Sequence, residues 1–293
     1  MKAKITIIWL ILTGFIFGGE QSIETKLSLE QSEFLMASPI TVTYIMTNKS
    51  STSVSLNCSD IIERIFVFDE TGKGYHPNEI GSYIGYPDTL RPGESCSGIF
   101  ELNIFSQLRE VKGQSIALKD LGFLPPGKYS VWAKGKIPVR FLSNTVTVTI
   151  KEPEGVDKEA FESFMQAKTL MYERDTNNKP KFAAYYSALI STGEKYSKSI
   201  YGECALNRAL TIYREVHTND LRGEIEFAKK LIVKYRNSSY LSRWFGYVFR
   251  GYRELKDRTT LIRTLEEYRD TYPNTKISQI AEKNLKSLEE MEF

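Results

Sequence analysis

The chain has 293 residues, of which 41% are hydrophobic and 12% aromatic, so a disordered protein is not the expectation. It carries 39 Lys and Arg against 36 Asp and Glu, a net charge of +3, and these residues form no basic cluster. The charge therefore argues against a protein that binds nucleic acid or an anionic membrane surface. The length suits two domains of ordinary size.

The first 19 residues have the layout of a secretory signal peptide. Lys2 and Lys4 precede the apolar run ITIIWLILTGFIF, and Gly18 and Gly19 follow it. The run is about 13 residues long, whereas a membrane-spanning helix needs roughly 18 to 20. Large residues stand where a small one is preferred before the cleavage site, so two alternatives remain. Residues 1–19 are either a cleaved signal peptide or an uncleaved N-terminal anchor, which would be the chain's only contact with a membrane, and both imply export.

Residues 22–153 show the alternation and turn punctuation of β-strands. PITVTYIMTN, from Pro39, alternates apolar residues with Thr, and NTVTVTI, from Asn144, does the same. Turn sequences such as DETGKG, RPGES and PPGK separate the runs. About seven short strands over roughly 130 residues predict an antiparallel β-sandwich.

Part of this region resembles a known family. The run KLSLEQSEFLMASPITVTYIMTNKSSTSVSL, with LRPGES and LPPGKYSVWA after it, is similar to bacterial immunoglobulin-like domains, in which a paired strand motif precedes a final PGxY hairpin. The chain departs from that pattern at Ala37 and Ser38, where the family has Gly-Glu before Pro. The resemblance implies the fold of the domain and says little about a ligand.

Export changes how the three cysteines are interpreted. Cys58 and Cys96 lie in the strand-rich half, and an oxidising compartment would let them form a structural disulfide. The alternative is that all three cysteines are buried thiols, as is expected for Cys204 in the helical stretch GECALNRAL. The chain has no CxxC motif and only two His, so neither a metal site nor a cofactor is predicted.

The segment KEPEG, residues 151–155, ends the strand pattern, and a helical period replaces it from residue 157 to residue 293. We expect about seven helices in this half, at residues 157–173, 180–196, 199–216, 219–235, 238–256, 257–272 and 275–292.

A repeat is visible within the helical half. Tyr196, Tyr235 and Tyr272 are spaced by 39 and 37 residues, in the range of two-helix solenoid units. A Ser, Thr or Asn follows each Tyr and is suited to cap the next helix. The spacing predicts a short α-solenoid.

These boundaries resemble those of tetratricopeptide-like helical repeats of the kind found in bacterial envelope lipoproteins. EEYRDTYPNTKISQIAEKNL follows that pattern well, whereas LIVKYRNSSYLSRWFGYVF places Trp244 where Ala281 stands in the last repeat. The resemblance covers about 110 residues and implies a surface for binding proteins. A large side chain at position 244 indicates a wider gap, an aromatic plug or an exposed surface.

The segment around Trp244 is the candidate binding groove. Arg243, Tyr247 and Arg250 share one face of the predicted helix, and Arg and Tyr are typical anchors for a protein segment. The alternative is that the aromatic residues of this helix pack between neighbouring helices.

No motif points to catalysis, because the chain lacks GxSxG, HExxH and phosphate-binding glycine loops. The sequence therefore favours a non-catalytic, exported protein-interaction module or scaffold of a bacterial envelope, in the periplasm, on the cell surface or secreted. A second hypothesis is that the sandwich inhibits a protease or binds carbohydrate, through loops such as HPNEIGSYIGYPD, with the helices as a spacer. An enzyme with an unrecognised site is the third.

Overall fold

A computed structural model describes residues 23–55, 65–82, 89–111, 114–135, 141–172 and 182–289. The expected signal segment and Cys58 lie outside these residues. The strands among the described residues are β1 Ile23–Leu29, β2 Glu33–Leu35, β3 Ile40–Asn48, β4 Val54–Ser55, β5 Ile65–Asp69, β6 Gly74–Ser82, β7 Thr89–Leu90, β8 Ser95–Val111, β9 Gln114–Gly122, β10 Gly127–Gly135, β11 Phe141–Leu142 and β12 Val146–Lys151. The helices among the described residues are α2 Gly155–Tyr172, α3 Phe182–Lys195, α4 Ile200–Thr211, α5 Tyr213–Val216, α6 Leu221–Lys234, α7 Leu241–Glu254, α8 Arg258–Thr271 and α9 Lys276–Glu289.

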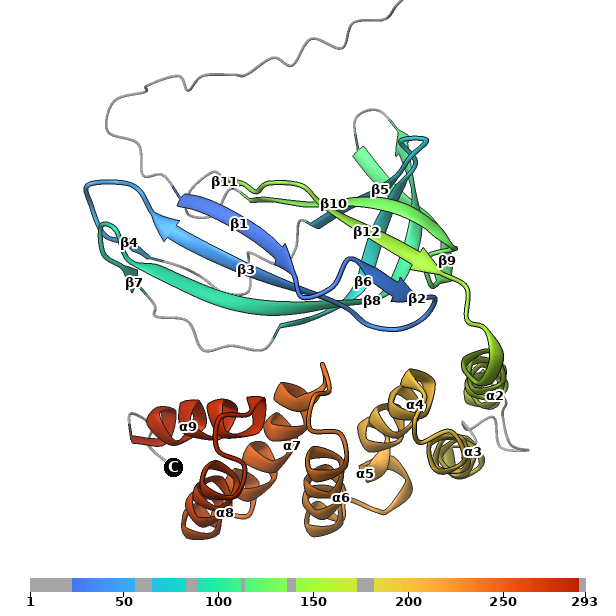
Figure 1. Cartoon of the computed structure of the whole chain (residues 1–293), viewed down its shortest axis with the longest axis vertical. Coiled ribbons are helices and arrows are strands. Elements are labelled where there is room, and N and C mark those ends of the chain that lie inside the picture. The colour runs from blue at the N-terminus through green and yellow to red at the C-terminus, as the bar shows by residue number, and fades with distance from the viewer. Residues whose placement is uncertain are drawn as a thin grey trace, which may run out of the picture.

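The N-terminal half is built on antiparallel β-sheet and the C-terminal half is helical, as the periodicity predicts (Figure 1). Ten of the described strands form one sheet in the order β1-β3-β8-β6-β5-β10-β12-β2, with β9 beside β8 and β11 beside β10. A separate pair joins β4 to β7. The strands outnumber the seven expected because several are only two or three residues long and show no alternation. One pairing, between β2 and β12, is parallel, which the sequence did not indicate.

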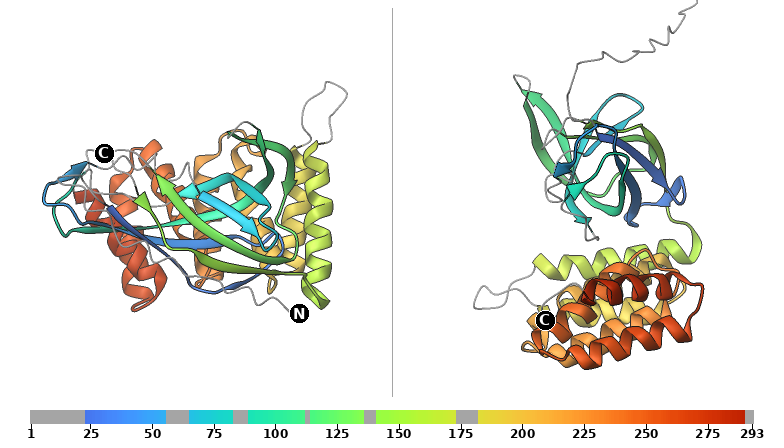
Figure 2. Two further views of the ribbon diagram at one scale, coloured as in Figure 1. Left: turned by 90° about the horizontal axis from the view of Figure 1, so that it is seen from above. Right: turned by 90° about the vertical axis from the view of Figure 1, so that its left-hand side faces the viewer.

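The edge strand β1 meets the segment between β11 and β12 through the side chain of Asn144. Its Oδ1 accepts a hydrogen bond from the backbone N–H of Leu27 at 2.7 Å, and its Nδ2 donates to the carbonyl of the same residue at 3.0 Å. An Asn side chain thus satisfies backbone groups on the edge of β1 that would otherwise lack a strand partner. The sheet curls around a single core as a result (Figure 2).

The alternation in β3 is confirmed. Its inward residues Ile40, Val42, Tyr44 and Met46 are each at most 2% exposed, and they belong to the core of the β half. The intervening Thr residues and Ile45 lie on the other face and are more exposed. Burial of these apolar side chains is the main contribution that the strand makes to stability.

The expected helices are found, with two differences. The predicted helix at residues 199–216 is interrupted at Ile212, whose backbone leaves the helical region (φ −104°, ψ 9°), so that α4 and the four-residue α5 are separate. The other helices begin or end at most three residues inside the predicted limits, except that α2 begins two residues before its predicted start. Capping explains where several begin: Ser199, Asp220 and Asp257 each accept a hydrogen bond from a backbone N–H in the first turn that follows.

The repeated boundary has one geometry at two of its three positions and a side-chain variant at the third. The backbone N–H of Ser199 donates to the carbonyl of Tyr196 at 2.9 Å, and that of Ser238 to Tyr235 at 3.0 Å. After Tyr272, the Thr275 hydroxyl donates to the Tyr carbonyl at 2.6 Å instead. The three positions that stand nine residues after each Tyr are also equivalent, because all are fully buried: Ala205, Trp244 and Ala281.

The two halves are in direct contact. Among the described residues, three partly buried apolar residues of the β half pack against the helical core: Leu35, Ala37 and Phe123. The hydroxyl of Tyr201, in α4, donates to the carbonyl of Met36 at 2.5 Å, and Lys276, in α9, pairs with Glu30 at 2.8 Å. Helices α4, α7 and α9 lie nearer the β half than α6 and α8 do (Figure 1).

The turn that makes this contact contains a residue in an unusual backbone conformation. Ala37 has a φ of 65°, in the left-handed region that Gly enters without strain. The turn is closed by the N–H of Ser38, which donates to the carbonyl of Leu35 at 3.0 Å. The Ala37 side chain packs against the helical core, so the turn contributes directly to the contact between the halves.

Candidate functional site

The four residues that the sequence singles out in α7 do not form one groove. Trp244 is 0% exposed, so it is an aromatic plug and cannot contact a partner, and its inclusion in an exposed groove is wrong. Its indole N–H donates to Oδ1 of Asn207, in α4, at 3.0 Å. A large side chain fits here because it fills the space between α4 and α7 and satisfies a buried amide.

The other three residues lie at the surface and make internal contacts. The guanidinium of Arg250 lies 4.7 Å from the ring centroid of Tyr247, and that of Arg243 lies 5.6 Å from the ring centroid of Tyr240. Cation–π contacts of this kind are worth about 0.5 to 1 kcal/mol at exposed sites. Arg250 and Tyr247 thus share a surface, as the helical spacing predicts, while Arg243 contacts the start of the helix.

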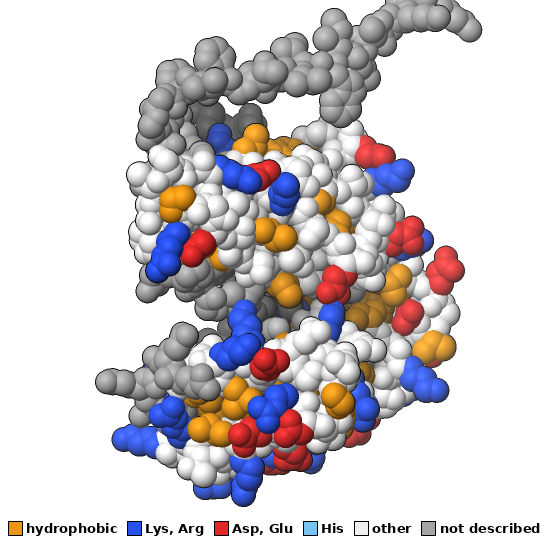
Figure 3. Space-filling model, turned by 60° about the vertical axis from the view of Figure 1, so that its left-hand side comes forward, with side chains coloured by type: hydrophobic (Ala, Val, Ile, Leu, Met, Phe, Trp, Pro, Cys, Tyr) orange, Lys and Arg blue, Asp and Glu red, His pale blue; other side chains and the backbone are white. Residues whose placement is uncertain are grey.

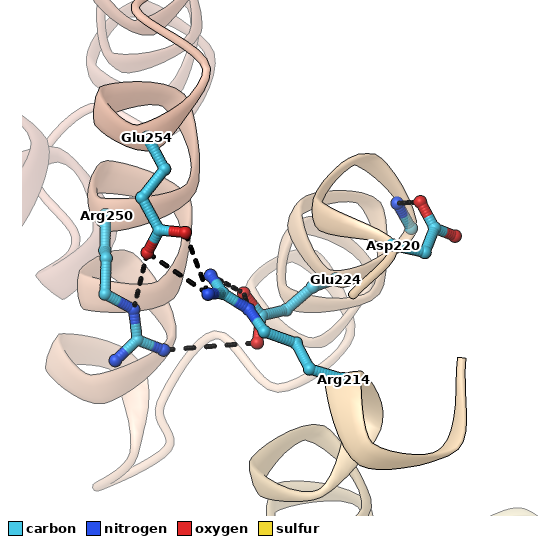
Figure 4. A network of polar contacts seen from close by, with 6 residues as sticks. Arg214, Asp220, Glu224, Arg250 and Glu254 are labelled. Carbon is cyan, nitrogen blue, oxygen red and sulfur yellow. Dashed lines mark hydrogen bonds and ion pairs between the residues drawn. The ribbon is translucent and has the colours of Figure 1, made fainter. Parts of the chain in front are cut away.

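Arg250 also takes part in a charged network with Arg214 (Figure 4). Arg214 contacts Glu224 at 2.6 Å and Glu254 at 2.9 Å, whereas Arg250 lies at 4.0 Å and 3.8 Å from the same two carboxylates. Glu224 is 1% exposed, and Arg214 supplies its closest hydrogen bonds. The network joins α5, α6 and α7, and its geometry is that of a structural ion pair with Arg250 as an outlying member.

A groove with an apolar floor lies between α6 and α8 in the helical half. We call it the α6/α8 groove; it has a volume of about 380 Å³, and its lining includes Lys230, Val233, Lys234, Glu267, Tyr268 and Tyr272. Val233 is 38% exposed, although it belongs to the apolar run of α6. The ring of Tyr268 is almost wholly buried and the ring of Tyr272 half-buried. The floor is therefore aromatic and one wall carries an exposed Val.

The rim of this groove is mainly basic. Lys230 and Lys234 are exposed on α6, and Arg236 lies beyond its end with its guanidinium 4.7 Å from the ring centroid of Tyr272. Glu267 is the single acidic residue in the lining. Charged side chains of both signs cover the helical half with hydrophobic side chains exposed between them (Figure 3). An apolar floor under a cationic rim suits a segment that carries carboxylates and an aromatic or aliphatic side chain.

The sequence did not single out this groove. The sequence feature that could have indicated it is Val233. This residue follows the buried pair Leu231 and Ile232 in the run AKKLIVK, and it lies outside the apolar stripe of the helix that begins with Ile225 and Ala228. The aromatic floor comes from α8, some 35 residues further on, and only the fold brings the two helices together.

Two further predictions, the loop of the second hypothesis and the structural disulfide, fall partly on residues that the structure does not describe. Residues 83–88 of the loop HPNEIGSYIGYPD, and Cys58 with its predicted disulfide to Cys96, lie outside the described residues, so both stay predictions. On the outer face of β5 and β10, Phe66 and Trp132 stack with their ring centroids 4.3 Å apart, and Phe68 lies 6.4 Å from each.

Within the described residues, no group of three or more His, Cys, Asp or Glu side chains is placed to hold a metal ion. The helices described there are also too short or too polar for any of them to cross a membrane.

No protein-family model matches the chain, and no curated protein matches it. Among solved structures, it is similar to a β-glucosidase from Listeria innocua (16% identity over 45% of this chain, TM-score 0.24) and to the β-glucosidase EmGH1 from Erythrobacter marinus (14% identity over 45%, TM-score 0.25). The match spans 16% of each of those chains. A likeness at this level establishes neither a shared fold nor a shared activity.

Proposed function

We propose that this chain is a non-catalytic, exported protein-interaction module of a bacterial cell envelope, and that it binds an acidic segment of a partner protein in the α6/α8 groove. The groove supports this proposal, because it combines exposed apolar area with a surplus of cations on one open face. Arg and Tyr are the residues that most often carry binding energy at protein interfaces. Charge on the rim accelerates association with an acidic partner.

In this proposal the helical half is a short α-solenoid and the β half an immunoglobulin-like sandwich. The recurrence of one turn after Tyr196 and Tyr235, with a side-chain variant after Tyr272, supports the first part. Stacked helix pairs provide extended surfaces for binding other proteins. The β half lies on the side of α4, α7 and α9, and α6 and α8 lie further from it (Figure 1). Export rests on the pattern of the first 19 residues.

Photo-crosslinking tests where the segment binds. A photoreactive amino acid replaces Val233, and the probe is a short synthetic peptide of Glu and Tyr carrying a fluorescent label. The matched control places the same amino acid at Val156, which is 64% exposed at the start of α2 and distant in sequence from the groove. We expect labelling at position 233 that an unlabelled excess of the peptide removes. Equal labelling at both positions would contradict the proposal.

A further inference from the structure

A second cavity lies between the two halves. It has a volume of about 230 Å³ and is lined from the β half by residues that include Phe34, Pro39 and Thr41, and from the helical half by Ile200, Glu203 and Ser238. This volume is below the usual range for pockets that bind drug-sized ligands, so it suits a single side chain better than a large molecule. We call it the interdomain cleft; none of its lining residues belongs to the α6/α8 groove.

The cleft is acidic. Its described lining contains two carboxylates, Glu30 and Glu203, and no Lys or Arg. Glu30 is exposed and pairs with Lys276 at 2.8 Å, so its charge is compensated. Glu203 is different, because it is largely buried and the contact found for its carboxylate among the described residues is a hydrogen bond from the Ser238 hydroxyl. Among the described residues, no Lys or Arg side chain forms an ion pair with the Glu203 carboxylate.

Two hydroxyl groups near Glu203 are also unsatisfied. Thr41 Oγ1, in the lining, and the phenolic oxygen of Tyr235 are buried and have no hydrogen-bond partner among the described residues. The charge of Glu203 acts on Tyr235 and contributes to raising the pKa of its phenol to about 12, after burial, the larger cause. The Thr41 hydroxyl in the lining is therefore able to accept a hydrogen bond from a ligand that reaches Glu203.

We propose that the interdomain cleft binds an alkylammonium group, such as the side chain of a lysine presented by a partner protein. Its ammonium donates hydrogen bonds to Glu203 and to Thr41, because an ammonium has three donors and no acceptor. The aliphatic stem packs on Phe34, Pro39 and Ile200, in the way that Lys stems cover apolar surface. This site is additional to the proposed function, and its ligand carries the opposite charge to the one expected in the α6/α8 groove.

The test measures binding of N-acetyl-lysine methylamide to the whole chain by the shift of backbone amide NMR signals. The neutral comparison is N-acetyl-norleucine methylamide, which keeps the stem and removes the charge. We expect the lysine derivative to bind and the norleucine derivative to bind at least tenfold more weakly. Equal affinity for the two would overturn the proposal.

Variants assign the binding to the cleft. Glu203→Gln should weaken the lysine derivative at least tenfold, while Glu226→Gln, an exposed carboxylate on α6, should leave it unchanged. Thr41→Val provides a second variant that keeps the fold, because its hydroxyl has no partner to lose, and we expect severalfold weaker binding. Binding that survives in both cleft variants would overturn the proposal. Tighter binding of the free diamine 1,5-diaminopentane than of the lysine derivative would overturn the claim that the ammonium group belongs to a protein side chain.

Discussion

The indole Nε1 of Trp244 lies 3.0 Å from Oδ1 of Asn207, and both side chains are buried in the helical half. Trp244 stands nine residues after Tyr235, as Ala205 and Ala281 stand nine residues after Tyr196 and Tyr272, and all three are fully buried. The hydrogen bond explains how a polar ring edge is accommodated there, since a buried indole N–H requires an acceptor.

Trp244→Phe removes this hydrogen bond and part of the ring volume. We expect a loss of about 2 to 4 kcal/mol in the free energy of unfolding, because a buried amide oxygen loses its donor and a cavity remains. Urea denaturation followed by circular dichroism measures it. Trp132→Phe is the matched control, since that ring is half-exposed on the β half, and it should cost less than about 1 kcal/mol. Equal losses in the two variants would contradict this account of Trp244.

The charged network makes a second prediction. Glu224→Gln should lower the free energy of unfolding by about 1 to 3 kcal/mol, because Arg214 loses its closest carboxylate in a buried setting. Arg250→Gln should change it by less than about 1 kcal/mol, because that guanidinium is half-exposed and its ion pairs are at 4.0 Å and 3.8 Å. A larger loss from Arg250→Gln than from Glu224→Gln in urea denaturation would contradict the geometry of Figure 4.

The contact between the halves predicts coupled unfolding. Tyr201→Phe removes the hydrogen bond to the carbonyl of Met36 and should cost about 1 kcal/mol or somewhat more. Both halves should lose this stability together, since Leu35 and Ala37 pack on the helical core. Near-ultraviolet circular dichroism and hydrogen exchange in the two halves measure the effect. A change confined to amides of α4 would show that the halves unfold independently.

Glu203 predicts a pH dependence of stability. Burial raises the pKa of its carboxyl above the ordinary value of 4.5, and the hydrogen bond from Ser238 lowers it only in part. Between the ordinary pKa of the unfolded state and the raised pKa of the folded state, the folded state binds more protons than the unfolded state. This group therefore makes the folded state less stable as the pH rises. The neighbouring charged pair of Glu30 and Lys276 is exposed, and Tyr235 stays protonated throughout this window.

The corresponding experiment compares thermal unfolding of the wild type and Glu203→Gln from pH 4.5 to pH 8, a range that begins at the ordinary pKa of the carboxyl group and extends above it. The wild type should lose stability relative to the variant as the pH rises, and the difference should level off above the raised pKa. A difference between the two proteins that does not change with pH would show that Glu203 is not desolvated.

Much of the fold follows from local sequence patterns. The alternation of apolar residues predicted the inward face of β3. The boundaries marked by Tyr predicted the ends of α3, α6 and α8, because capping residues and Pro act on backbone positions close to them in the sequence. The break at Ile212 was not predicted, since its apolar neighbours continue the helical period. The short strands β2 and β11 were missed for a similar reason: their pairing partners lie far away in the sequence.

The candidate sites were harder to predict. Periodicity gives the face of α7 that carries Arg250 and Tyr247, but it does not tell which side chains the next helix covers, so Trp244 was placed wrongly. The groove and the cleft both depend on residues brought together from separate elements: Val233 with Tyr272, and Thr41 with Glu203. Such contacts are set by tertiary packing and leave no local signal.

The dissociation constant of the Glu-Tyr peptide tests the central claim most directly. It is measured by fluorescence anisotropy for the wild type, for Lys230→Glu/Lys234→Glu on the groove rim, and for Lys158→Glu/Lys198→Glu, which makes the same charge change at two exposed lysines elsewhere on the helical half. The account predicts at least tenfold weaker binding for the rim variant, binding close to wild type for the control, and weaker binding at higher salt. Equal weakening in the two variants, or none in either, would contradict it.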